Sequence, residues 1–128
     1  MNVETRTADG VLIVRPGAGR ITALSGADLL RQALEKAIAR GHLAIAVDLD
    51  GVEYADSTML GVLISAFKAL NQRGGLVCAF NVGSELREFF HQTVLDRVID
   101  VCKDESEALG LFAGRARKKR RGLLGRFS

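Results

Sequence analysis

The sequence contains no tryptophan, one tyrosine and one proline, and aromatic residues make up only 5% of it. Any hydrophobic core must therefore be aliphatic, and the apolar content of 48% is sufficient to build one. No run comes near the roughly 20 apolar residues that span a bilayer. The opening residues, MNVETRTADG, lack the apolar stretch of a secretory signal. For a chain of 128 residues we therefore expect a single cytoplasmic domain.

Side chains that react or bind metals are also scarce. Cys78 and Cys102 form no CxxC pair and lie in apolar runs, which predicts buried free thiols. His42 and His91 are isolated, so we expect no metal site. The sequence has no GxGxxG, no GxxxxGK[ST] and no GxSxG, so neither a cofactor nor an enzymatic activity is expected.

Acidic side chains are absent from the end of the chain. Residues 1–113 carry 11 basic and 15 acidic side chains, a net charge of −4, whereas residues 114–128 carry 7 basic side chains and no acid. We call residues 114–128 the basic tail and predict that it is disordered, because it cannot form a packed unit alone. It is either a solvated extension, a tether to an anionic membrane surface, or a contact for the acidic part of the chain or an acidic partner. An acidic folded part without an aromatic platform argues against a specific nucleic-acid partner.

Strand and helix patterns alternate along residues 1–113 and predict an α/β fold with a mixed, mainly parallel sheet. We expect about four to five strands packed with about four helices. The predicted elements are a hairpin around Asp9-Gly10, a helix capped by Ser25, a strand at 43–49, a helix after Asp56, a strand at 76–80, a short helix capped by Ser84, an edge strand at 98–101 and a helix opened by Asp104.

The stretch ADSTMLGVL places two hydroxyl side chains at a predicted helix start. Asp56 precedes the helix, and Ser57 and Thr58 fall in its first turn, where N–H groups lack intrahelical partners. All three residue types are good helix caps, and capping alone would explain them. The alternative is a phosphorylation site, because a phosphate on Ser57 would meet the positive end of the helix dipole.

The run from VDLDGVEYADSTMLGVL to FFHQTVLDRVI resembles the STAS-domain anti-sigma factor antagonists of bacterial partner-switching systems. The shared pattern is a buried strand, the motif D-S-[ST]-x-[LI]-G-[VL]-L, a helix ending near GG, another strand and a short helix. It covers about residues 3–112 and implies one STAS domain over residues 1–113. It also implies that Ser57 is the phosphoacceptor, with Thr58 as the alternative, and that the chain is not an enzyme.

The resemblance implies specific partners as well. In that family an anti-sigma factor acts as a serine kinase on the antagonist, a PP2C-type phosphatase removes the phosphate, and the unmodified antagonist binds the anti-sigma factor. The implied docking surface lies around residues 55–65. Its predicted partner-binding residues are Thr22, Asp56, Ser57, Thr58, Met59, Leu60 and Gly61.

Two positions depart from the family pattern. Met59 stands where glycine is usual, and Thr22, in GRIT, stands where an acid is usual. Some related STAS domains are not phosphorylated and serve as structural subunits of membrane lipid-transport or signalling complexes. The alternative to an antagonist is therefore such a subunit, located peripherally at the inner membrane surface through the basic tail.

Overall fold

The computed structural model describes residues 2–127 of the chain, and the side chains of residues 2–117. It opens with the predicted hairpin, in which β1 (Glu4–Ala8) pairs antiparallel with β2 (Val11–Arg15). Asp9 and Gly10 connect the strands with φ angles of 51° and 78°. Two successive positive φ angles match the twist of a hairpin, and Asp-Gly is a favoured pair for them.

The main sheet has five strands in the order β1-β2-β4-β6-β7. β4 (Ala44–Asp48), β6 (Leu76–Phe80) and β7 (Asp100–Cys102) follow β2 in parallel pairs, which confirms the predicted mixed, mainly parallel sheet. The last strand begins two residues later than the predicted 98–101 edge strand. The N–H groups of Val98 and Ile99 donate instead to the Leu95 carbonyl, in a short 3-10 turn at Leu95–Arg97.

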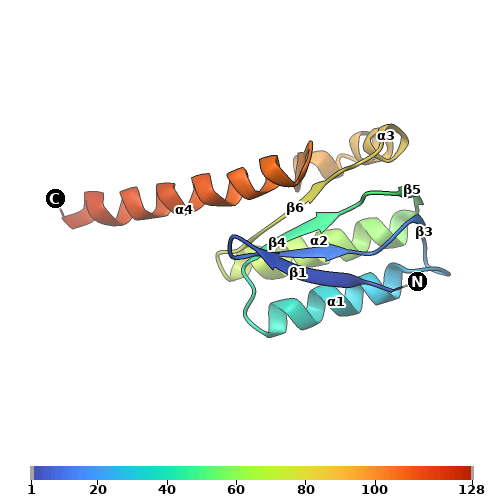
Figure 1. Ribbon diagram of the computed structural model, residues 1–128, viewed down its shortest axis with the longest axis horizontal. Helices are drawn as coiled ribbons and strands as arrows, with labels where there is room; N and C mark the ends of the chain where they lie inside the picture. Colours follow the sequence, from blue (N-terminus) through green and yellow to red (C-terminus); the bar gives the residue numbers. More distant parts are fainter. Residues whose placement is uncertain (1, 128) are drawn as a thin grey trace.

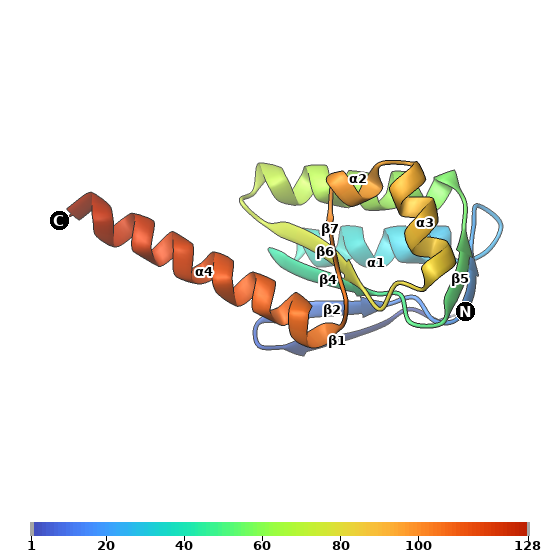
Figure 2. The ribbon, with the colours of Figure 1, turned by 90° about the horizontal axis from the view of Figure 1, so that it is seen from above.

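Helices cover both faces of this sheet. α1 (Ala27–Ala39) and α2 (Ser57–Gln72) lie on one face, and α4 (Glu105–Phe127) lies on the other (Figures 1 and 2). The alternation of strand side chains separates two hydrophobic clusters. Ile45 and Val47 of β4 face the larger cluster, with α1 and α2, whereas Ala46 faces the smaller one, with α4. α3 (Ser84–Gln92) packs against β5 (Val52–Ala55), a strand outside the main sheet.

The smaller cluster contains both thiols. Cys78 and Cys102 are buried and free, as the sequence predicts, and burial raises the pKa of Cys78 far above that of an ordinary thiol. In the part of the chain that the structure describes, no group of three or more His, Cys, Asp or Glu side chains could hold a metal ion.

Two predicted helix caps are wrong. α1 begins at Ala27, and its N-cap is Gly26, with a φ of 82° and no side-chain cap, because Ser25 belongs to the preceding turn. α3 begins at Ser84 itself, after an N-cap at Gly83 that has no side-chain cap either. The Asp104 cap is confirmed, since its Oδ1 accepts the Glu107 N–H at 2.9 Å.

The basic tail differs from its prediction, because α4 continues through it as far as Phe127. Ala108 is fully buried, and Leu109, Leu111 and Phe112 pack against the smaller cluster, so this half of the helix is anchored on the sheet. Alanine, leucine, arginine and lysine are all good helix formers, and these types dominate residues 111–121. Among the described residues no helix combines the length and the apolar character needed to cross a membrane.

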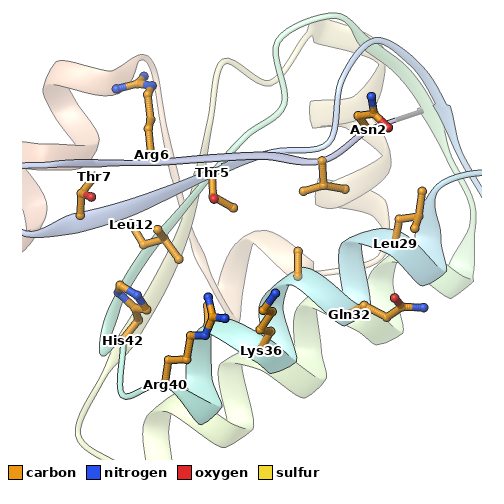
Figure 3. A pocket seen from close by; sticks show the side chains of 13 residues that line it. Asn2, Thr5, Arg6, Thr7, Leu12, Leu29, Gln32, Lys36, Arg40 and His42 are labelled. Carbon is orange, nitrogen blue, oxygen red and sulfur yellow. The ribbon is translucent and has the colours of Figure 1, made fainter.

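β1 forms one edge of the main sheet, and its side chains alternate between the two faces. Thr5 and Thr7 point toward α1 and line a groove of about 510 Å³, together with the basic side chains Lys36 and Arg40 (Figure 3). Arg6 points to the other face, where it forms an ion pair with Glu105 of α4. The strand is almost entirely exposed to solvent.

A second, two-stranded sheet lies beside the main one. In it β3 (Gly19–Ile21) pairs in parallel with β5. Neither strand is predicted from the sequence, since both are short, β3 contains Gly19 and Arg20, and β5 contains Glu53. This small sheet leads into both segments of the candidate site: the turn after β3, and the start of α2 after β5.

Candidate functional site

The start of α2 has the arrangement that the sequence predicts. Asp56 is the N-cap, with an extended backbone, and Ser57 and Thr58 are the first two helical residues. Oδ1 of Asp56 accepts the N–H groups of Thr58 at 3.0 Å and Met59 at 3.4 Å. The carboxylate therefore already satisfies two of the N–H groups that an α-helix leaves unpaired at this end.

The other oxygen of Asp56 connects the helix to a distant segment. Oδ2 accepts the Ala23 N–H at 3.0 Å, and the Asp56 N–H donates to the Ile21 carbonyl at 3.3 Å. The hydrogen bond donated by the Ala23 N–H is the largest cause of the lowered pKa of Asp56, and the N–H groups of Met59 and Thr58 contribute less. Asp56 is thus a clamp, in the sense that one carboxylate holds both the α2 start and the turn after β3.

That turn, residues 22–26, is closed by its own hydrogen bonds. Thr22 and Ser25 exchange backbone bonds of 2.7 and 3.0 Å, and Oγ1 of Thr22 accepts the Leu24 N–H at 3.2 Å. The Leu24 side chain at its tip is 99% exposed. The predicted site residues Thr22 and Asp56, 34 positions apart in the sequence, therefore lie together in the structure.

A hollow of about 510 Å³ adjoins the clamp. Thr22, Leu24 and Asp56 line it, together with Arg20 of β3 and Tyr54 of β5. The Arg20 guanidinium lies 4.7 Å from the centre of the Tyr54 ring, within the range of a cation–π contact. Tyr54 remains 47% exposed.

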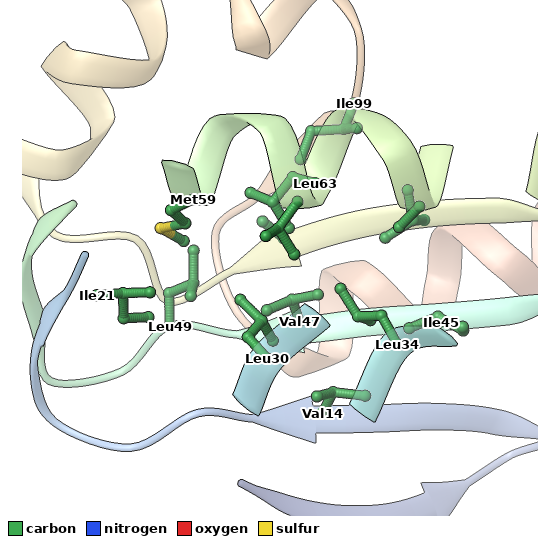
Figure 4. Packing of buried hydrophobic residues seen from close by; sticks show 14 of the residues in the cluster. Val14, Ile21, Leu30, Leu34, Ile45, Val47, Leu49, Met59, Leu63 and Ile99 are labelled. Carbon is green, nitrogen blue, oxygen red and sulfur yellow. The ribbon is translucent and has the colours of Figure 1, made fainter. Parts of the chain in front are cut away.

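Met59 does not belong to the surface for which the sequence analysis predicts it. Its side chain is fully buried and points into the larger cluster near Ile21 and Leu49 (Figure 4). Met59 shares this inward face with Leu63, one helical turn further on. The structure therefore removes the Met59 side chain from the predicted partner-binding set, and its bulk stays away from Ser57.

The remaining predicted residues lie at the surface or near it. Ser57, Thr58 and Gly61 are exposed, and Leu60 is half-buried. Thr58 and Gly61 also line a groove of about 500 Å³ between α1 and α2, with Val62 and Ala66 among its apolar residues. Ser57 thus lies on an exposed helix start that borders both the groove and the clamp.

The surroundings of the Ser57 hydroxyl bear on whether it could act as a nucleophile. Among the described side chains none forms a hydrogen bond with the Ser57 hydroxyl, and the nearest carboxylate, Asp56, is committed to backbone N–H groups. A serine nucleophile needs an adjacent general base.

Sequence reasoning missed the clamp and the hollow beside it. The strand that carries Tyr54 has a weak signal in the turn Asp50-Gly51 followed by VEYA. Nothing in the sequence alone indicates that the Ala23 N–H donates to Asp56, because the contact joins segments 33 positions apart. The exposure of Leu24 has no sequence signal either, since a leucine is ordinarily assigned to the hydrophobic core.

Comparison with known proteins identifies the family of the chain. The STAS domain family model matches residues 2–108. The anti-sigma-B factor antagonist of Listeria monocytogenes is 36% identical over 93 residues, covering 73% of this chain and 81% of its own. The anti-sigma F factor antagonist of Paenibacillus polymyxa is 28% identical over 116 residues, covering 85% and 92%.

Solved structures show the same fold. The crystal structure of an anti-sigma factor antagonist from Mycobacterium paratuberculosis superposes with a TM-score of 0.77 at 26% identity, covering 86% of this chain and 92% of that one. The expected fold class is thereby confirmed. The chain belongs to the STAS domain family, as a relative of the bacterial anti-sigma factor antagonists.

Proposed function

We propose that this protein is an anti-sigma factor antagonist controlled by phosphorylation of Ser57. In its unmodified form it binds an anti-sigma factor kinase and keeps that protein from its sigma factor. Phosphorylation of Ser57 by the kinase ends the binding, and a PP2C-type phosphatase restores it. The protein itself performs no catalysis in this cycle and requires neither a cofactor nor a metal.

The observation that carries this proposal is the position of Ser57. Its hydroxyl is exposed and unpaired, at the first residue of α2 directly after the Asp56 cap, in a chain 36% identical to an anti-sigma-B factor antagonist. A kinase needs such an accessible hydroxyl, whereas a purely structural cap does not. The Asp56 carboxylate caps the helix here, so the Ser57 hydroxyl is not needed as a cap and remains accessible for modification.

Electrostatics suggests how phosphorylation would end the binding. A phosphate brings a charge of about −1.5 to −2. The N–H groups that would ordinarily receive it are already bonded to Asp56, so two anions would compete for one helix start. The added charge would lie on the surface where the partner docks, and burying it there without a counter-ion is unfavourable.

A structural role at a membrane is the second candidate. The observation that favours it is the charge of the basic tail, whose 7 basic side chains are accompanied by no acid. Each base near an anionic surface contributes on the order of 1 kcal/mol to binding. In this case the protein associates peripherally with the membrane, and Ser57 needs no modification.

The test is phosphorylation with the purified anti-sigma factor kinase of the same organism and ATP. We expect one added phosphate in the intact mass, located on Ser57 by fragmentation, and none in Ser57→Ala. Thr58→Ala is the matched control and should still gain one phosphate, on Ser57. A phosphate on Thr58 alone, or no phosphate with a kinase that modifies another antagonist, would contradict the proposal.

A further inference from the structure

The most exposed large apolar side chain of the described residues belongs to a turn that has little freedom to move. Leu24 is 99% exposed, yet the turn 22–26 is closed by the Thr22–Ser25 bonds and fixed to α2 through Ala23 and Asp56. A leucine on a mobile loop would need no explanation, because isolated exposed apolar residues are common. A leucine held rigidly in water, by contrast, is already ordered for insertion into a partner.

Two further features surround Leu24 and indicate the same role. Tyr54 and Arg20 line the same hollow, and both types are enriched among the residues that dominate binding energy at protein interfaces. Arg20 has an exposed guanidinium over the Tyr54 ring and forms no ion pair among the described residues. The hollow therefore offers an apolar anchor, an aromatic face and a guanidinium without an ion-pair partner among the described residues, beside the Asp56 carboxylate.

We propose that Leu24 is the apolar anchor by which the protein docks on its anti-sigma partner, and that Asp56 is the positioning residue that holds this anchor beside Ser57. The proposal rests on the proposed function. The partner surface that fits is an apolar pocket for Leu24 bordered by a carboxylate for Arg20. A phosphate on Ser57 would compete with Asp56 for the Thr58 and Met59 N–H groups, so the clamp couples the modification to the position of the anchor.

Asp56→Asn separates the two functions of the clamp. Asparagine is as good an N-cap as aspartate, so one side-chain oxygen still accepts the Thr58 N–H. The atom that replaces Oδ2 is an NH₂ group, which cannot accept the Ala23 N–H. This variant should keep α2 intact while releasing the turn. The Ala23 amide should then exchange with solvent at least about tenfold faster, the loss expected for one hydrogen bond.

The docking test measures the affinity of the full chain for the purified anti-sigma factors of its organism by calorimetry, without ATP so that Ser57 stays unmodified. Leu24→Ser should weaken binding by at least about tenfold, as for an interface anchor. Leu43→Ser is the matched control, because Leu43 is 45% exposed at the opposite end of the sheet, and it should bind like the unchanged chain. Asp56→Asn should also weaken binding, and the double variant should lose less than the product of both effects.

The outcomes separate the two proposals. If the unchanged chain binds but Leu24→Ser binds equally well, Leu24 is not the anchor and the proposed function stands. If both single variants weaken binding and their effects simply multiply, Asp56 does not act through Leu24. If the unchanged chain binds none of the anti-sigma factors, both the proposed function and the docking role are wrong. Unchanged exchange at Ala23 in Asp56→Asn would overturn the clamp regardless of any partner.

Discussion

Truncating Met59 to alanine tests whether this side chain belongs to the core or to the docking surface. The substitution removes the Cγ, Sδ and Cε atoms from a fully buried position. At roughly 0.8 kcal/mol for each buried methylene-sized group, the transfer loss alone is about 2 kcal/mol. The neighbouring Ile21 lies in β3, which is hydrogen-bonded to β5, so the site has little freedom to collapse around the cavity.

We therefore expect Met59→Ala to lower the free energy of unfolding by about 3 kcal/mol, within the 2–5 kcal/mol range of such truncations. Urea denaturation followed by circular dichroism measures this directly. At low temperature the folded fraction should still be phosphorylated on Ser57, because the hydroxyl is not part of the packing. Met59→Leu preserves volume and should cost less than about 1.5 kcal/mol.

The pair of variants also decides between the two placements. Substituting a buried residue lowers stability and leaves the affinity of the folded protein for its partner unchanged. Substituting a docking residue lowers the affinity and leaves stability unchanged. A loss below about 1 kcal/mol for Met59→Ala would refute the core placement. So would a Met59→Leu variant that keeps its stability but loses affinity for the anti-sigma factor.

Four further outcomes are expected. Gly61→Ala should stabilise α2 by about 0.5–1 kcal/mol, since the added methyl group would meet no atom within 4 Å apart from its chain neighbours and the backbone of its own helix. It should weaken partner binding if the groove at Thr58 is a docking surface; calorimetry and urea titration measure the two effects. Ser57→Ala should bind the anti-sigma factor like the unchanged chain and Ser57→Glu more weakly, so equal affinities would exclude charge as the switch. Because the pKa of Asp56 is lowered in the folded state, the ionised clamp stabilises the fold at pH values above the unfolded-state pKa. This stabilisation is lost as the pH falls through the folded-state pKa. In acid denaturation, Asp56→Asn should lack this pH dependence. A chain ending at residue 113 should keep its melting temperature within a few degrees, since Leu109 and Phe112 remain, and should lose any salt-sensitive sedimentation with anionic vesicles that the full chain shows.

The main sheet could be predicted because its strands carry strong local signals. Residues 43–49 and 76–80 are continuous apolar runs, as expected for strands covered on both faces, and Asp9-Gly10 specifies a hairpin. The helix start at Asp56 was predictable for the same reason, since the cap and the change of period are adjacent in the sequence.

What could not be predicted depends on contacts between distant segments. Ser25 appeared to be a cap because its chemistry is suitable, but the backbone bonds of Thr22 close a turn around it first. The resemblance placed Met59 in the partner-binding set, whereas in the structure its side chain packs in the larger cluster with Ile21 of β3. The clamp itself requires Ala23 and Asp56 to meet, which no local pattern records.

The edges of the main sheet have a consequence for the behaviour of the protein at high concentration. An uncovered strand edge is a template on which further copies can assemble into aggregates. At one edge β1 is only five residues long and carries Glu4 and Arg6, and at the other β7 has three residues. A second copy that paired edge to edge with β1 would bring its own strand beside Glu4 and Arg6, whose charges disfavour such pairing. Short, charged edges of this kind disfavour edge-to-edge association of two such sheets.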